Sequence, residues 1–187
     1  ASWATYRAVL AKLGRQPGPA PSFGELREVV ASAGPPLTLV AATDGNHGHA
    51  VAHLAALLGL PAVVLVPAGT AASRVERITA EGAEVRVVHG TYDDTIVASA
   101  ALDDATHVVV DDTSWEGYTD VPGWVVDGYS TMLTEVVAAI DPFRIEALWR
   151  RVYARGYSAR PDVSLVGVLS GLEMACWDIV GKAVEKP

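Results

Sequence analysis

The stretch Ala41-Ala42-Thr43-Asp44-Gly45-Asn46-His47-Gly48 joins an apolar run to a helical pattern through two glycines. Residues 38–42 are short and apolar, which is typical of a strand buried in a parallel sheet. Residues 47–58 have the spacing of a helix. Ligands of open α/β sheets bind at the carboxyl ends of the strands, so we expect a ligand site at this turn.

The same alternation of strand and helix continues along the chain. Further strands are predicted at 62–66, 85–88 and 107–110, with helices between them at 71–81 and 92–104. We expect these strands to be buried on both faces. Two helices precede the first strand, one at 2–13 and one from an N-cap at Ser22 through Val30. This order predicts an α/β fold in which a parallel sheet lies between helices, a three-layer αβα core.

Residues 141–187 follow a different pattern. Helices are predicted at 143–155 and 164–182, around a loop, so this part forms a C-terminal helical hairpin. We therefore predict two domains, an α/β domain at 1–140 and a helical segment at 141–187. On the second helix we expect Cys176 to be buried, and Asp178 to pair with Lys182 one turn later.

Composition narrows the classes of partner. The chain has 187 residues, half of them apolar, and a net charge of −8. No basic run is longer than Arg150-Arg151, so we do not expect nucleic acid or an anionic membrane as a partner. Apolar stretches fall short of the roughly 20 residues of a membrane span. The lone Cys176 and the lack of a signal-peptide pattern favour a reducing, cytoplasmic location.

The turn at residues 43–48 offers binding chemistry. Gly45 and Gly48 allow close approach of a ligand, the free amides of the new helix favour an anion or a polar ring, and Asn46 both donates and accepts. A tight turn without ligand explains the spacing equally well, because Gly-x-x-Gly is neither the dinucleotide nor the P-loop pattern. From the residues alone, Asp44 as a helix cap and Asp112 as a turn residue are favoured over catalysis.

Three histidines near this turn raise the question of a metal site. His49 and His53 are one helical turn apart, and His47 precedes them. No Glu follows His49 as in zinc proteases, and Cys is absent nearby. We predict no metal here, and interpret the histidines as a polar helix start that faces solvent.

Six short motifs occur in register along the first 140 residues: Thr43-Asp44-Gly45-Asn46-His47-Gly48, Pro67-Ala68-Gly69-Thr70, Glu81-Gly82-Ala83-Glu84-Val85, Tyr92-Asp93-Asp94, Asp112-Thr113-Ser114-Trp115-Glu116-Gly117-Tyr118 and Gly128-Tyr129-Ser130-Thr131-Met132. Together they closely resemble the diaminopropionate ammonia-lyases. These are pyridoxal-phosphate enzymes of the tryptophan-synthase-β-like class. The resemblance covers residues 1–140.

The resemblance implies a cofactor, a reaction and a set of residues. It implies pyridoxal 5′-phosphate as the cofactor, and an amino-acid substrate, 2,3-diaminopropionate, that β-elimination converts to pyruvate and ammonia. Asn46 would lie against the 3′-hydroxyl of the pyridoxal ring, with Gly45, His47 and Gly48 around it. Asp44 would handle the substrate proton, and Asp112 would lie near the substrate amino groups, so both are candidate catalytic residues.

Two parts of the family pattern are missing. The family's Schiff-base lysine belongs to a Phe-Lys motif that would precede Ala1, and this chain's lysines, Lys12, Lys182 and Lys186, match no such motif. The glycine-rich loop that holds the cofactor phosphate is not found either. We therefore expect a truncated lyase domain that is not catalytic alone.

Residues 141–187 resemble a second family. The motifs Arg144-Ile145-Glu146-Ala147-Leu148-Trp149 and, at 169–183, LSGLEMACWDIVGKA are similar to the N-terminal capping-domain helices of mandelate-racemase-like members of the enolase superfamily. Two alternatives follow. The chain is a non-catalytic chimeric or recombinant α/β domain, or it is a fragment of an acid-sugar dehydratase, which the lack of a barrel disfavours. Exposed sheet edges and apolar helix faces would favour a homo-oligomer.

Overall fold

The computed structural model describes residues 1–18, 22–32, 37–43, 45–138, 141–154 and 163–185. The chain divides into two compact units, Ala1–Tyr129 and Ser130–Pro187. The first contains α1 (Ser2–Lys12), α2 (Phe23–Ser32), β1 (Thr38–Ala42), α3 (Asn46–Leu58), β2 (Ala62–Pro67), α4 (Ala72–Ala80), β3 (Glu84–Val88), α5 (Tyr92–Ala100) and β4 (His107–Val109). Helix α6 (Asp120–Ala138) continues into the second unit, which contains α7 (Ile145–Ala154) and α8 (Val163–Ala183).

The four strands form one parallel sheet in the order β3-β2-β1-β4. Val40 of β1 lies in register with Val63 of β2 on one side and with Val109 of β4 on the other. The chain thus moves outward from β1 to β3 and then returns to the opposite side of β1. The predicted α/β parallel fold is confirmed, and the reversal places a switch point at the carboxyl ends of β1 and β4.

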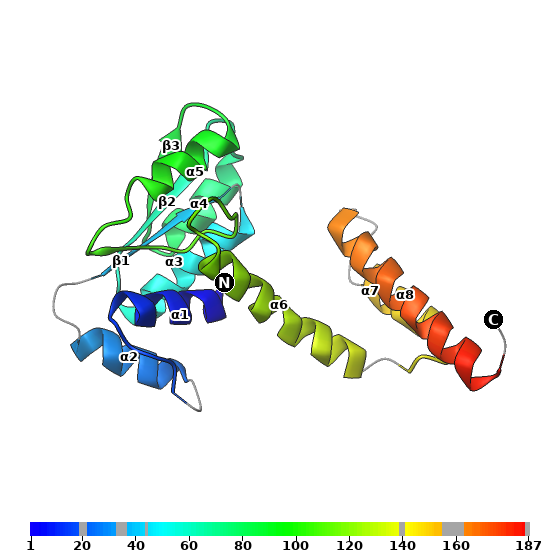
Figure 1. The fold of residues 1–187 in the computed structure, drawn as a ribbon. Coiled ribbons are helices and arrows are strands. Elements are labelled where there is room, and N and C mark those ends of the chain that lie inside the picture. Colours follow the sequence, from blue (N-terminus) through cyan, green and yellow to red (C-terminus); the bar gives the residue numbers. More distant parts are fainter. Residues whose placement is uncertain (19–21, 33–36, 44, 139–140, 155–162, 186–187) are drawn as a thin grey trace. The chain divides into compact units, whose positions relative to one another are not determined.

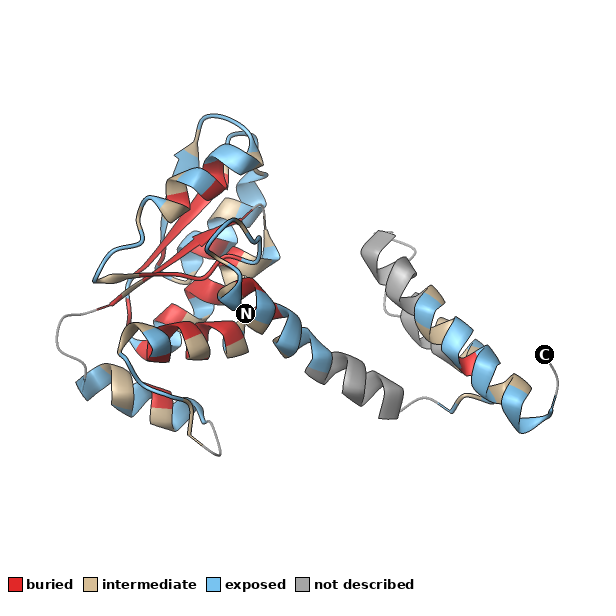
Figure 2. Cartoon of the chain, in the orientation of Figure 1, coloured by how far each residue is buried: buried red, intermediate tan, exposed pale blue. Residues whose placement is uncertain are grey.

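Helices cover both faces of the sheet. On one face, side chains such as Leu39, Val64 and Val110 pack with buried residues of α1 to α4. On the other face, Val40, Val63, Leu65 and Val109 form a smaller cluster beside α5 and the 115–118 segment. Figure 1 shows the sheet between α5 and the helices α3 and α4, and Figure 2 shows that β1 and β2 form its buried centre. These are the three predicted layers.

Local signals begin and end several helices where the sequence predicts. The N–H of Glu25 donates to Ser22 Oγ over 3.1 Å, which confirms the N-cap of α2. Thr91 and Asp94 form a capping box at the start of α5. Helix α3 ends at Gly59, whose φ of 70° is the left-handed conformation that glycine adopts without strain.

The sequence prediction was wrong for the burial of one strand. β3 was expected to be buried on both faces, but it lies at one edge of the sheet, and Val87 is 54% exposed. Its Glu84 and Arg86 form an ion pair at 2.7 Å on the exposed surface. In addition, α6 was not predicted, and α5 ends at Ala100 rather than near residue 104.

The second unit contains the predicted pair of C-terminal helices. Lys182 Nζ lies 2.6 Å from Asp178 Oδ2 on α8, as expected from their spacing, and Cys176 is buried. The predicted domain boundary between residues 140 and 141 stays a prediction. Within the described part of the chain, none of the helices has the length and apolar character that crossing a membrane requires.

Candidate functional site

The candidate site lies where β1 and β4 end. After β1 the chain turns through Thr43 and Gly45 into α3, and after β4 it continues into Asp111 and Asp112. The N–H of Gly45 donates to Thr43 Oγ1 over 3.0 Å, and the N–H of Thr43 donates to the carbonyl of Leu65 over 3.0 Å. These bonds hold the turn against the sheet, at the switch point where α/β proteins bind ligands.

Gly48 permits the close packing of this turn. A Cβ at this position would lie 2.2 Å from Thr43 Cγ2 and 2.8 Å from Val64 Cγ1. Both distances are too short for a side chain to be accommodated without movement. The glycine therefore lets the first turn of α3 lie directly on the ends of β1 and β2, and this brings the amides of that turn to the carboxyl edge of the sheet.

His47 connects the two strand ends. Its Nε2 lies 2.6 Å from the carbonyl oxygen of Val110, and its Nδ1 lies 3.7 Å from Asp112 Oδ2. Because a carbonyl oxygen only accepts, Nε2 carries a proton, and Nδ1 faces the Asp112 carboxylate. The side chain is 6% exposed, so the expectation that the histidines form a solvent-facing stripe was wrong for His47.

Asp111 forms a buried polar cluster beneath the site. Its carboxylate accepts the N–H of Ala42 over 2.6 Å and the hydroxyl hydrogen of Ser99. The side chain is fully buried, and this burial raises the pKa of Asp111 to about 6, although the two hydrogen bonds oppose the rise. Asp111 therefore links β1, α5 and the end of β4.

Tyr118 fixes the other side of the same strand end. Its hydroxyl donates to the carbonyl of Val109 and accepts the N–H of Asp111, both over 2.9 Å. Burial raises the pKa of Tyr118, so the phenol remains protonated and able to donate. Its ring stacks on Trp115 with centroids 3.9 Å apart. Sequence reasoning missed Ser99 and Tyr118 as partners of Asp111, because only the fold brings these positions together.

The structure brings together some of the predicted site residues. Gly45, Asn46, His47 and Gly48 lie at the start of α3, and Asp112 approaches them through His47. Asn46 is exposed, and its side chain makes no hydrogen bond to another described residue. Asp44 lies outside the described residues.

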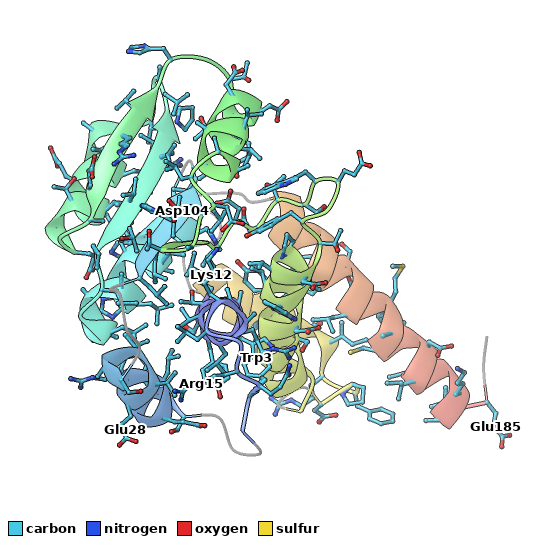
Figure 3. All side chains as sticks on the ribbon, turned by 60° about the vertical axis from the view of Figure 1, so that its left-hand side comes forward. Trp3, Lys12, Arg15, Glu28, Asp104 and Glu185 are labelled. Atoms are coloured by element: carbon cyan, nitrogen blue, oxygen red, sulfur yellow. The ribbon has the colours of Figure 1, made fainter. Side chains whose placement is uncertain are left out.

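The two described lysines pair with carboxylates elsewhere. Lys12, at the end of α1, lies 2.7 Å from Asp103, next to Asp104 in the turn before β4 (Figure 3). That turn is at the amino end of β4, whereas Asp112 follows its carboxyl end. Ala1, at the opposite end of α1, is close enough to Asp112 for their charges to interact. Lys182 pairs with Asp178 on its own helix.

A second cluster of titratable groups joins α3 to α4. Glu81 accepts from His49 Nε2 over 3.1 Å and from His53 Nδ1 over 3.0 Å. The hydrogen bond from His53 holds the pKa of Glu81 below its usual value, and the bond from His49 adds to the effect. The described residues contain no group of three or more His, Cys, Asp or Glu side chains arranged to hold a metal ion.

Comparison with known proteins shows the class to which this fold and site belong. The model of the family described as pyridoxal-phosphate dependent enzyme matches residues 24–171. The chain therefore belongs to the pyridoxal-phosphate dependent enzymes. The match continues beyond residue 140, where the sequence predicted the lyase-like part to end. The resemblance of residues 141–187 to the enolase superfamily stays a prediction.

Within this class the chain is similar to diaminopropionate ammonia-lyases. It is 41% identical over 117 residues to the enzyme of Escherichia coli strain K12, a match that covers 62% of this chain and 29% of that protein. Human L-serine dehydratase/L-threonine deaminase is 31% identical over 140 residues, covering 74% of this chain and 38% of that protein. The chain thus spans only about a third of the length of the bacterial lyase.

Solved structures agree with this assignment. The crystal structure of the apo form of Escherichia coli diaminopropionate ammonia lyase superimposes with a TM-score of 0.64 at 34% identity, covering 74% of this chain and 37% of that chain. The complex of that lyase with D-serine superimposes with a TM-score of 0.63 at 35% identity. This match covers 74% of this chain and 35% of the lyase chain. This chain is a diaminopropionate ammonia-lyase-like segment of the pyridoxal-phosphate class.

Proposed function

We propose that this chain provides the part of a carbon–nitrogen lyase that holds the cofactor ring. The reaction is the β-elimination of ammonia from 2,3-diaminopropionate, which yields pyruvate and ammonia. The observation that carries the proposal is the meeting of the Asn46–Gly48 turn and Asp112 at the switch point, through His47. The 41% identity to the Escherichia coli lyase supports 2,3-diaminopropionate as the substrate. The D-serine complex of that lyase supports an amino acid as the ligand.

The chemistry of the donors at this turn fits pyridoxal 5′-phosphate. Asn46 offers an exposed amide that both donates and accepts, which suits the ring hydroxyl. The first-turn amides of α3 lack intrahelical acceptors and favour a polar or anionic group. When bound, the cofactor supplies the electron sink for a carbanion at the substrate Cα. Gly45, Asn46, His47 and Gly48 are the residues that would hold its ring.

The two carboxylates handle protons and the cationic substrate. Asp112 is partly exposed, and its Oδ2 lies 3.7 Å from His47 Nδ1, so the carboxylate is placed at the turn and remains available to a substrate ammonium group. Asp44, which follows Thr43 in the sequence, is assigned to accept the proton from the substrate Cα. The buried Asp111 does not reach solvent and supports the end of β4 instead.

Turnover by these 187 residues alone is not part of the proposal. Lys12 is held by Asp103 near the opposite edge of the sheet, and Lys182 is held by Asp178. Neither described lysine lies at the turn, and no glycine-rich phosphate-binding loop is found in the sequence. We therefore propose reversible binding of the cofactor without pyruvate formation.

Titration with pyridoxal 5′-phosphate, followed by tryptophan fluorescence, tests the binding residues. The wild-type chain should bind saturably, and Asn46→Ala should weaken binding about fivefold, the value of one hydrogen bond. His47→Gln should weaken it as well, because Asp112 and the end of β4 lose their orienting contact. Glu28→Gln, on the exposed surface of α2, is the matched control and should bind like the wild type.

Two further measurements separate this proposal from its alternative. Borohydride reduction and peptide mapping should find no lysine attached to the cofactor, and 2,3-diaminopropionate should give no pyruvate. Attachment at Lys12, or steady release of pyruvate, would contradict the proposed arrangement. If a folded chain shows no saturable binding, the second candidate holds, namely an α/β domain without a cofactor role.

A further inference from the structure

A groove opens between α1, α2 and α3, and it contains none of the candidate site residues. Its volume is about 230 Å³. Among the described residues that line it none is charged, and its walls are mainly the apolar and aromatic side chains of Trp3, Tyr6, Phe23, Leu26, Leu54 and Leu58. Figure 3 labels Trp3, which lies near the start of α1.

Two successive residues of α1 that line this groove have buried hydroxyl groups without a hydrogen-bond partner. Thr5 Oγ1 and Tyr6 Oη are both buried, and neither has a hydrogen-bond partner among the described residues. Thr5 is 1% exposed and Tyr6 is 6% exposed, and both line the groove. The large majority of buried polar side-chain atoms are hydrogen-bonded, so two orphaned hydroxyls on successive residues require an explanation.

The local structure of α1 does not provide that partner. A helical threonine often donates to the carbonyl four residues earlier, here that of Ala1. That carbonyl accepts the backbone N–H of Thr5 over 2.9 Å, and the hydroxyl does not join it. Both hydroxyls retain their capacity to donate and to accept, and a ligand oxygen can use it.

The groove has a fixed aromatic wall. Trp3 stacks on Tyr6 with centroids 5.6 Å apart and planes 13° apart. The guanidinium of Arg7 lies 5.4 Å from the Trp3 ring centroid and 4.7 Å from that of Trp124, which holds Trp3 from outside the groove lining. Phe23, 41% exposed, contributes the most accessible part of the opposite wall.

We propose that this groove binds a small neutral molecule that combines an apolar ring or short chain with one hydroxyl or carbonyl oxygen. The ring lies against Trp3, Tyr6 and the leucines, and the oxygen bonds to the hydroxyls of Thr5 and Tyr6 once the groove opens enough to expose them. Charged ligands are excluded because the lining offers them no counter-charge. The volume equals that of about seven or eight water molecules at roughly 30 Å³ each, which suits a phenol-sized molecule.

A pair of fluorinated probes tests the proposal on the whole 187-residue chain. 4-Fluorophenol and fluorobenzene differ by the hydroxyl group alone, and their binding is followed by ¹⁹F NMR titration. The wild type should bind 4-fluorophenol saturably and about fivefold more tightly than fluorobenzene, the value of one hydrogen bond. Leu54→Phe, which fills the groove, should weaken both probes.

Thr5→Val and Tyr6→Phe remove one hydroxyl each at nearly constant shape. Each should bring the affinity ratio of the two probes towards one while fluorobenzene still binds. Thr79→Val is the matched control, since the Thr79 hydroxyl already donates to the Val75 carbonyl on α4, and it should leave the ratio unchanged.

Thermal unfolding without ligand provides a second readout. Loss of an orphaned hydroxyl should leave the melting temperature unchanged or raise it, whereas Thr79→Val should lower it, because only the latter loses a hydrogen bond. The proposal is overturned if the folded wild type binds neither probe, if it binds both equally, or if the ratio survives both substitutions. If either Thr5→Val or Tyr6→Phe does not fold, the affinity ratio measured on the other variant tests the proposal.

Discussion

At the residue scale, Gly48 determines whether the candidate site can form. The packing of α3 on the strand ends requires its missing side chain, because a Cβ would overlap Thr43 and Val64. The Gly-x-x-Gly spacing of Gly45 and Gly48 supports a turn without a ligand and a ligand-binding turn equally well. Tertiary packing explains Gly48 by contact with the sheet, and the same contact exposes the Asn46 amide.

Gly48→Ala should destabilise the chain by about 1–3 kcal/mol, the cost of overpacking. Urea unfolding measures the effect. Gly123→Ala on α6 is the matched control, because a Cβ there meets nothing within 4 Å, and it should be neutral or slightly stabilising. Thr43→Ser should recover part of the loss in the double variant, because it removes the Cγ2 that overlaps. An unchanged stability of Gly48→Ala would contradict this packing.

Asp111 makes stability depend on pH in the direction opposite to that of a paired surface carboxylate. Its pKa is raised from 3.8 to about 6 in the folded state, so the folded chain binds the proton more tightly than the unfolded chain does. The resulting stabilisation is fully present below pH 3.8 and is lost as the pH rises through 6. The amide that Asp111→Asn introduces does not titrate, so the stability of this variant lacks this pH dependence.

The free energy of unfolding of Asp111→Asn, relative to the wild type, should therefore increase by about 2–3 kcal/mol between pH 4 and pH 7. Urea midpoints of both chains at several pH values measure this difference. Effects of all other titrating groups cancel in the comparison. A difference that stays constant with pH would show that Asp111 is ionised throughout, and would contradict the raised pKa.

At the element scale, the contact between α3 and α4 depends on one carboxylate. Glu81 ends α4 and accepts from His49 and His53, one turn apart on α3. These bonds lower the pKa of Glu81. Its stabilisation is therefore present above pH 4.5, the unfolded value, and is lost as the pH falls through the lower folded value.

Glu81→Gln should lower the melting temperature near pH 6, and the difference from wild type should shrink as the pH is lowered below 4.5. Differential scanning calorimetry at pH 6 and at a series of lower pH values checks this. Glu76→Gln, on the exposed part of α4, serves as the control and should show neither effect. Equal melting temperatures of Glu81→Gln and wild type at pH 6 would show that the histidines do not use this carboxylate.

At the scale of the whole molecule, the exposed apolar side chains of α8 suggest self-association. Met174, Trp177 and Ile179 are exposed on this helix, although the chain carries a net charge of −8. Apolar groups gathered on one surface element favour contact between copies. We expect the chain to form oligomers as its concentration rises, through the second unit.

Trp177→Glu should reduce this association, because it removes the largest of the three side chains and adds a charge. Sedimentation velocity across a range of concentrations measures the change. Gly171→Glu adds the same charge on the same helix without removing an apolar group, and nothing lies within 4 Å of its added Cβ. The prediction is wrong if both variants associate to the same extent.

The sequence by itself determined the strands, most helices and the class of fold. Short apolar runs, separated by helical periods of ten or more residues, leave few arrangements other than a parallel sheet between helices. Six motifs in register, of which Thr43 to Gly48 is one, also carried the resemblance to the family before any contact was known. Signals of this kind are local, because they depend on spacing and on residue types that lie next to each other in the chain.

Only the tertiary structure decided which strands lie at the edges and which groups meet. The runs at β2 and β3 both look buried, but β3 lies at one edge of the sheet with exposed side chains, and no local signal encodes the strand order. His47 meets Val110, and Asp111 meets Ala42 and Ser99, across sequence separations that the crossover connections close. Burial follows from these long-range contacts, and burial in turn sets the pKa of Asp111 and leaves the hydroxyls of Thr5 and Tyr6 without partners.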